Sequence, residues 1–238
     1  MSYELSNAPM MPVAAPSIFQ TWITALTKPN EQTYRDIAAS PNAKATTAYL
    51  WVFISLFVTY VFTFLVEGST LRDRLTQSGV STDRLGGGVV GIVVALICVA
   101  PILAVIGTLF FAIGVAIVQW IAKMFGGKGT FDQMAYTFAA ISVPYSLVSS
   151  VFILLSAIPF VGLCFRIILG LAGIYILVLE ILAVKGVNQF GIGAAIGSLF
   201  IPGLAVALIV CCLVAVSISL LGPMIGNVFS SINQSLTP

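Results

Sequence analysis

The chain has 238 residues, of which 59% are apolar and only 8% are charged, and its net charge is +2. A soluble domain carries about 25% charged residues, because a water-exposed surface must be largely polar. Together with a mean hydropathy of +1.10, these values exclude a soluble globular enzyme, a disordered protein and a nucleic-acid-binding protein. The composition is that of an integral membrane protein.

Residues that usually carry chemistry are scarce. The chain has no histidine, which removes the commonest metal ligand and proton-transfer group. The four cysteines lie in apolar stretches, where thiols behave as small hydrophobic side chains. We therefore expect no catalytic residues, no metal site, no other cofactor and no enzymatic activity.

The N-terminal region precedes the first long apolar run. Residues 1–16 hold three prolines and no apolar run, so we expect a disordered tail rather than a signal peptide. The apolar residues that follow recur at helical spacing, which predicts a short amphipathic helix with Ser17 as its N-cap and Lys28-Pro29 as its end. A second short helix is expected over residues 31–39.

Uncharged runs locate the membrane spans, because a helix needs about 20 apolar residues to cross the hydrocarbon core. The sequence predicts five such spans, near residues 46–66, 98–121, 135–156, 161–184 and 194–221. The fold class is therefore an all-α integral membrane protein, a bundle of five transmembrane helices with short amphipathic helices at both termini.

The uncharged run over residues 85–121 leaves the number of spans open. It is long enough for one span with an interfacial lead-in, or for two short segments broken at Pro101. We favour one span, because the glycine triplet at 86–88 weakens the early part of any helix there. Six spans are the alternative.

Prolines mark two further features. Pro144 lies in the middle of the third span and is expected to kink it. Gly222-Pro223 is expected to end the fifth span, which leaves residues 222–238 as a short amphipathic tail.

The basic residues predict the orientation of the chain. With five spans, six of them fall on one side of the membrane: Lys28, Arg35, Lys44, Lys123, Lys128 and Lys185. The other side receives Arg72, Arg74 and Arg84, with Arg166 near its border. This excess predicts a cytoplasmic N-terminus and an outer C-terminus.

Arg166 and Glu180 are the only charges inside a predicted span. Charges within a membrane are costly and are functional candidates by default. Each lies within a turn or so of a span end, however, where a long side chain can reach the interface. A structural role is therefore favoured over a substrate or proton path.

Polar side chains cluster beside Pro144 on one face of the third span. They are Ser142, Tyr145, Ser146 and Ser149. Such a stripe most often forms hydrogen bonds with neighbouring helices, although a path for a polar substrate would use the same residues. We retain Pro144, Tyr145 and Ser146 as functional candidates beside Arg166 and Glu180.

Three segments carry a resemblance to a known family: residues 27–38 (TKPNEQTYRDIA), residues 131–136 (FDQMAY) with 142–145 (SVPY), and residues 182–187 (LAVKGV). In these segments the chain resembles the Yip family of Ypt/Rab-interacting membrane proteins, in the form that also occurs in prokaryotes. The resemblance covers residues 17–221 as one domain. It implies five spans, a cytoplasmic N-terminus and, for a prokaryotic member, the cytoplasmic membrane.

Eukaryotic members of that family act in vesicle trafficking and bind small GTPases. The chain lacks their Asp-Leu-Tyr-Gly-Pro-like motif, so small-GTPase binding is not carried over. The expected partner is the lipid bilayer, with other membrane proteins or further copies of the chain as open alternatives and no nucleic acid. The first hypothesis is a non-catalytic membrane scaffold or organiser. The alternative is a small transporter or channel that uses Arg166, Glu180 and the polar face of the third span.

Overall fold

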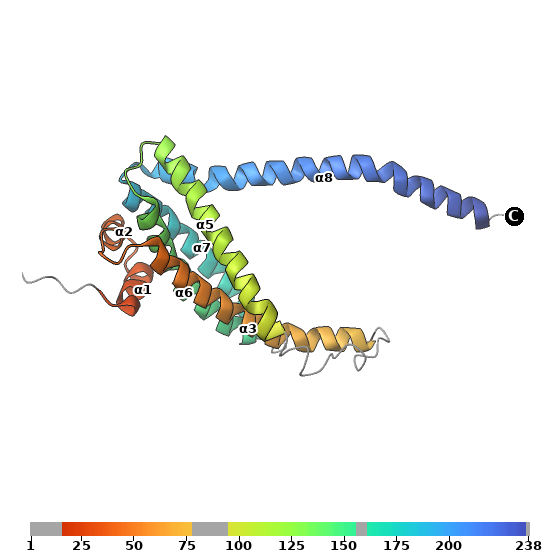
Figure 1. Cartoon of the computed structure of the whole chain (residues 1–238), viewed down its shortest axis with the longest axis horizontal. Coiled ribbons are helices and arrows are strands. Elements are labelled where there is room, and N and C mark those ends of the chain that lie inside the picture. Colours follow the sequence, from red (N-terminus) through yellow and green to blue (C-terminus); the bar gives the residue numbers. More distant parts are fainter. Residues whose placement is uncertain (1–15, 78–94, 156–160, 237–238) are drawn as a thin grey trace, which may run out of the picture.

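The computed structural model describes residues 16–77, 95–155 and 161–236, and these residues form helices joined by short turns (Figure 1). The elements are α1 (Ile18–Thr27), α2 (Glu31–Ala38), α3 (Ala45–Gln77), the π-helical turn η2 (Ala95–Val99), α5 (Ala100–Met124), α6 (Phe131–Leu155), α7 (Val161–Asn188) and α8 (Ile192–Leu236). The predicted tail over residues 1–16 lies, except for Pro16, outside the described residues.

Five helices are long and apolar enough to cross a membrane, which confirms the predicted class and number of spans among the described residues. The spans are Ala45–Leu65, Leu96–Met124, Phe131–Ile153, Gly162–Asn188 and Ile192–Val214. The described part of the ambiguous run forms a single span. Pro101 lies in the first turn of α5, directly after the π-helical turn η2, and does not divide the span.

The two short N-terminal helices form where they are predicted, and each begins at a capping residue. The Ser17 side chain accepts a hydrogen bond from the backbone N–H of Gln20, and α1 ends at Thr27, directly before Lys28-Pro29. The Asn30 side chain accepts a hydrogen bond of 2.7 Å from the backbone N–H of Thr33 at the start of α2. Each cap pairs a backbone donor that the first helical turn leaves free.

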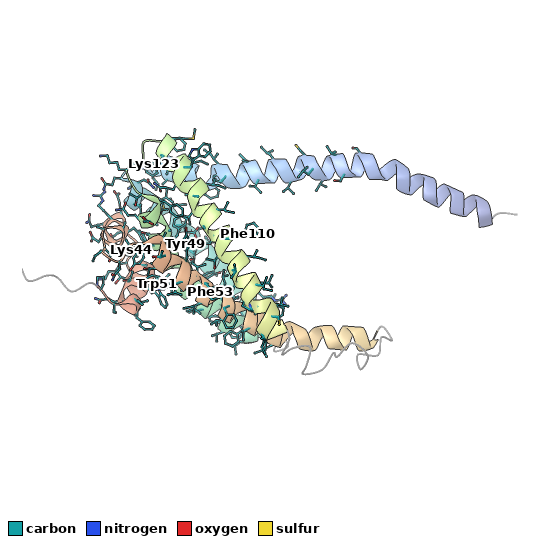
Figure 2. The ribbon with its side chains drawn as sticks, viewed as in Figure 1. Lys44, Tyr49, Trp51, Phe53, Phe110 and Lys123 are labelled. Atoms are coloured by element: carbon teal, nitrogen blue, oxygen red, sulfur yellow. The ribbon has the colours of Figure 1, made fainter. Side chains whose placement is uncertain are left out.

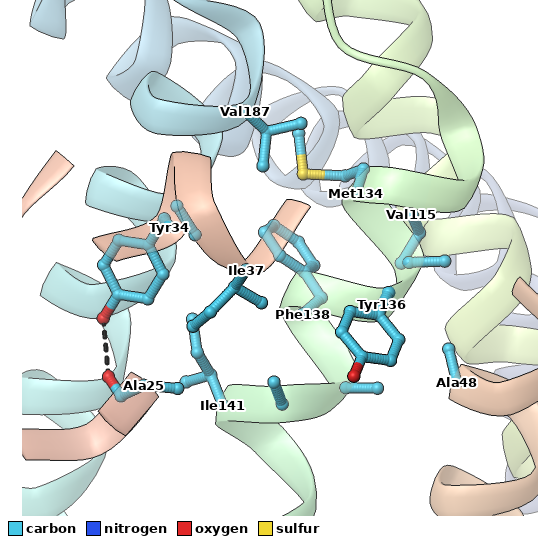
Figure 3. Packing of buried hydrophobic residues seen from close by; sticks show 14 of the residues in the cluster. Ala25, Tyr34, Ile37, Ala48, Val115, Met134, Tyr136, Phe138, Ile141 and Val187 are labelled. Carbon is cyan, nitrogen blue, oxygen red and sulfur yellow. Dashed lines mark hydrogen bonds between the residues drawn. The ribbon is translucent and has the colours of Figure 1, made fainter. Parts of the chain in front are cut away.

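Helix α6 is the centre of the bundle and packs against α1, α2, α3, α5 and α7. Residues 134–141 are buried without interruption, and Figure 3 shows Met134, Tyr136 and Phe138 surrounded by side chains of the neighbouring helices. Three alanines among the buried residues let the other helices approach closely: Ala135, Ala139 and Ala140.

Among the described elements, helix α8 packs mainly against α7 and α5. It leaves the bundle after its first turns and runs away from the other helices (Figure 1). The expectation that it ends at Gly222-Pro223 is corrected, because α8 continues through both residues to Leu236. A proline forfeits one helical hydrogen bond, and this loss alone does not end a helix.

Among the residues that the structure describes, one end of the bundle holds nine of the 15 charged side chains. Here α5 and α7 end, α3, α6 and α8 begin, and α1 and α2 are docked; we refer to it as the polar end (Figure 1). The six basic residues assigned to one side from the sequence belong to these segments, and Figure 2 labels two of them, Lys44 and Lys123.

Candidate functional site

Helix α1 carries two faces of different character. Thr21 and Ala25 are buried against the bundle. On the outer face, the apolar side chains of Ile18, Phe19 and Ile23 are 46%, 70% and 62% exposed. We refer to these three residues as the α1 ridge. The helix is therefore anchored on one side and presents an apolar edge on the other.

Two tyrosines fasten the C-terminal half of α1. The buried Tyr34 hydroxyl of α2 donates to the carbonyl oxygen of Ala25 at 2.8 Å, and the Tyr175 hydroxyl of α7 donates to that of Leu26 at 2.7 Å. Burial raises the pKa of Tyr34, so its hydroxyl keeps the proton that it donates. These bonds fix α1 to both α2 and the membrane span α7.

Helix α2 is held on α7 by an ion pair and by a close backbone approach. The Glu31 carboxylate lies 2.8 Å from the Lys185 ammonium and 2.7 Å from the Arg35 guanidinium. The hydrogen bond from Lys185, with the charges of Lys185 and Arg35, lowers the pKa of Glu31 against the opposing effect of burial. A Cβ atom on Gly186 would lie 2.7 Å from the Glu31 carbonyl oxygen, so the helices meet where only glycine fits.

A buried amide pair holds the loop between α5 and α6. The Gln119 side-chain amide donates to the Gly129 carbonyl oxygen at 2.7 Å and to the Asn188 side-chain oxygen at 3.0 Å. The Asn188 amide donates in turn to the carbonyl oxygen of Val184 at 3.2 Å. Both side chains are buried, so this network fixes the ends of α5 and α7 to each other.

A chain of aromatic rings leads from the surface of α1 into the bundle. Phe19 meets Trp22 edge-on with 5.5 Å between ring centroids, and Trp22 meets Trp51 of α3 in the same way at 5.5 Å. Trp51 then packs against the buried Tyr136 of α6 at 5.0 Å. Since edge-to-face contacts are favourable, the α1 ridge is coupled to the centre of the core.

A cavity of about 470 Å³ lies between α5, α6, α7 and α8. Its walls are mostly apolar, with Phe111, Val115 and Phe138 among them, and the polar side chains that line it are Ser142 and Glu180. Glu180 has no hydrogen bond or ion pair to any described residue. We refer to this space as the Glu180 cavity.

The model of the Yip1 domain matches residues 23–228, from within α1 to within α8. The chain is a member of the Yip family. No curated protein and no solved structure matches it. The match includes all five spans, the polar end and the Glu180 cavity of this Yip-family protein.

The two intramembrane charges are not brought together in this Yip-family protein. Arg166 is exposed near the start of α7, and Glu180 is half-buried about 21 Å further along the same helix. No ion pair of Arg166 is formed within the described part of the chain. The two candidates therefore belong to different environments.

The polar side chains beside Pro144 on α6 also lie in different environments. Ser142 lines the Glu180 cavity, whereas the Tyr145 hydroxyl donates to the Leu169 carbonyl oxygen of α7 at 3.4 Å. Ser146 donates to the carbonyl oxygen of Val143 within its own helix at 2.9 Å. Pro144 is half-buried within α6, which is one continuous helix.

Sequence reasoning missed two other polar contacts of α6. The hydroxyls of Ser150 and Thr59 lie 2.8 Å apart and join α6 to α3. The Asp132 carboxylate accepts a hydrogen bond of 3.1 Å from the backbone N–H of Ala45, at the start of α3. The sequence does show hydroxyl side chains within apolar runs and a carboxylate at the start of a helix. Neither signal identifies the residue to which the side chain binds.

The described residues contain no group of three or more cysteine or carboxylate side chains that could hold a metal ion. All four cysteines are free and exposed. The polar arrangements at the polar end hold helices together, whereas the Glu180 cavity presents to an apolar space a carboxyl group that no described residue pairs.

Proposed function

We propose that this Yip-family protein is a non-catalytic membrane scaffold or organiser that works through helix packing and protein contacts. The observation that carries the proposal is the α1 ridge. Ile18, Phe19 and Ile23 stand outside the five spans on a helix that the bundle holds in place. An apolar edge of this kind lies in the headgroup layer of a bilayer or against the apolar face of a neighbouring membrane protein.

The support for a scaffold, rather than a flexible tether, is the rigidity of the attachment. Hydrogen bonds to Ala25 and Leu26, the ion pair of Glu31 and the aromatic chain from Phe19 all connect the N-terminal helices to the spans. Insertion of the ridge would therefore act on the whole bundle.

We further propose that the polar end faces the cytoplasm, in the cytoplasmic membrane of a prokaryotic cell. The six basic residues of this end support that orientation, because basic residues are retained on the cytoplasmic side. A single cysteine replacing Ser40 in a background free of the native cysteines should be shielded from an impermeant thiol reagent in intact cells. Labelling without permeabilisation would show instead that the polar end faces the outside of the cell.

The scaffold proposal is tested by replacing Ile18, Phe19 and Ile23 together with serine. The matched control is Gln20→Ser, an exposed polar position on the same helix. In reconstituted vesicles and in cross-linked native membranes, the triple variant should lose both the wild-type effect on vesicle shape and the cross-linked neighbours. The control should keep both. Unchanged vesicle shape and cross-linking in the triple variant would remove the basis of the proposal.

A small transporter or channel is the second candidate, and the Glu180 cavity is the observation that favours it. It ranks lower because Arg166 lies elsewhere and the hydroxyls of Tyr145 and Ser146 are bonded to backbone carbonyls. Solute and proton flux into liposomes should be the same for wild type and Glu180→Gln if the scaffold proposal holds. Flux that depends on Glu180 would favour transport.

A further inference from the structure

We propose that the Glu180 cavity is a binding site for a membrane amphiphile. An apolar chain fills the cavity, and a hydrogen-bond donor in the head group, either a hydroxyl or an ammonium, binds the carboxyl group of Glu180. This site is separate from the α1 ridge, so the inference does not depend on the scaffold role.

The depth of the cavity places it inside one leaflet. At 1.5 Å per residue, Glu180 lies about 12 Å from the end of α7 at Asn188. Val115 lies about 13 Å from the end of α5, and Ser142 about 16 Å from the start of α6. Three helices thus contribute to the cavity at similar depth, within the leaflet next to the polar end.

Glu180 lacks a partner that would compensate for its position. A carboxyl group at this depth is costly unless it forms a hydrogen bond or an ion pair. Lys185, the nearest basic residue along α7, is already paired with Glu31. No described residue supplies a donor to Glu180, which leaves its carboxyl group available to a donor carried by a ligand.

The walls determine what else the ligand must be. Phe111, Val115 and Phe138 offer apolar surface, and the polar side chains on the lining are Ser142 and Glu180. A volume of about 470 Å³ is within the range of roughly 300–1,000 Å³ that small-molecule sites occupy. The cavity is open rather than enclosed, and α8 diverges from α5 beside it (Figure 1). A molecule that dissolves in the bilayer can therefore enter sideways.

Two glycines provide a matched pair of variants. Gly114 lines the cavity, and no atom lies within 4 Å of the position that its Cβ would take. Gly170, on the exposed side of α7, has the same open surroundings and does not line the cavity. Gly114→Leu should fill the cavity, whereas Gly170→Leu adds the same side chain facing lipid. Both changes favour the helix equally, so a difference between them reports on the cavity.

The probes are octadecylamine and octadecanol carrying a photoactivatable diazirine in the chain. The full-length protein is reconstituted in phosphatidylcholine vesicles, because this lipid has no donor in its head group to compete. After illumination, labelled peptides are quantified by mass spectrometry. We expect labelling in the peptides that hold residues 111–118 and 202–206, which line the cavity.

Glu180→Leu removes the hydrogen bond to the head group and should reduce this labelling about tenfold. Gly114→Leu fills the space for the apolar chain and should reduce it to a similar extent. Gly170→Leu should leave it unchanged. Glu180→Gln distinguishes the head groups: it should abolish labelling by an ammonium probe and keep labelling by a hydroxyl probe. Equal labelling in wild type, Glu180→Leu and Gly114→Leu, or no labelling of wild type by either probe, would overturn the proposal. If Glu180→Leu fails to fold, the two glycine variants decide alone.

Discussion

Helices α6 and α8 are both apolar enough to cross a membrane, yet they are buried to very different degrees. In its most apolar stretch, 44% of α6 is buried, compared with 6% of α8. Helix α6 is also the least hydropathic of the five spans. Helix α8, with a mean hydropathy of 2.5, is therefore in contact with the bundle only near its start, and α6, with the lowest mean hydropathy of 1.5, forms the core.

This contrast follows from the solvent. Lipid is as apolar as a leucine side chain, so hydrophobicity does not drive helices together within a bilayer. Small residues and polar contacts do. Helix α6 has buried alanines and a hydroxyl pair between Ser150 and Thr59. Helix α8 presents large side chains to its surroundings, with Leu204, Leu208 and Leu213 about 60% exposed.

We expect the largest effect on stability from an alanine-to-leucine substitution made once in α6 and once in α8. Ala139→Leu inserts a large side chain at a fully buried position of α6 and should lower the free energy of unfolding by about 1–3 kcal/mol. Ala205→Leu, at an exposed position of α8, should change it by less than about 0.5 kcal/mol. Both changes in unfolding free energy can be measured in bicelles, with steric trapping as the method that monitors unfolding. Equal costs would mean that α8 is packed as tightly as α6.

The second prediction concerns the buried amide pair at the polar end. Asn188→Leu leaves the side chain of Gln119 without one of its partners and should cost about 2 kcal/mol of unfolding free energy. The double variant Gln119→Leu/Asn188→Leu should cost less than the sum of the two single variants, because neither amide is then left unpaired. Additive costs would contradict a direct coupling.

Local signals in the sequence were sufficient for several elements. The Ser17 cap of α1, the helix α2 and the five spans depend on short stretches of chain, since capping side chains and apolar run length act within a helix. Partners distant in the sequence were not predictable. Glu31 and Lys185 are ordinary charges until the fold brings α2 to the end of α7.

The same limit applies to the candidate site. The sequence indicated Glu180 as an unusual charge, and the fold adds Ser142 and the apolar walls from three other helices. It was wrong about Gly222-Pro223, because a glycine and a proline weaken a helix without necessarily ending it, and α8 continues through both.

The third prediction tests the docking of α2. Gly186→Ala should push α2 from α7, because the new Cβ would lie 2.7 Å from the Glu31 carbonyl oxygen. We expect a loss of about 1 kcal/mol in the local stability of α2, measured as reduced amide protection by hydrogen exchange. Gly170→Ala, where the Cβ meets no atom within 4 Å, should leave the protection of α2 unchanged. Equal protection in both variants would mean that α2 adjusts without leaving α7.

The smallest effect is the pH dependence of the same contact. The pKa of Glu31 is lowered from its ordinary value of 4.5, chiefly by the hydrogen bond from Lys185. A lowered pKa means that the ion pair contributes its full stability above about pH 4.5 and loses it as the pH falls through the folded-state value.

A partly exposed pair is worth about 0.2–1 kcal/mol. The amide protection factors of α2, corrected for intrinsic exchange, should therefore fall by a factor of about 1.4 to 5 in acid. Glu31→Gln should start at the lower protection and show no such fall, whereas a fall of equal size in this variant would assign the pH dependence to a different group. Because α8 has no charged residue, its protection should not change over the same range, which carries the contrast between the two regions into a measurement on the intact protein.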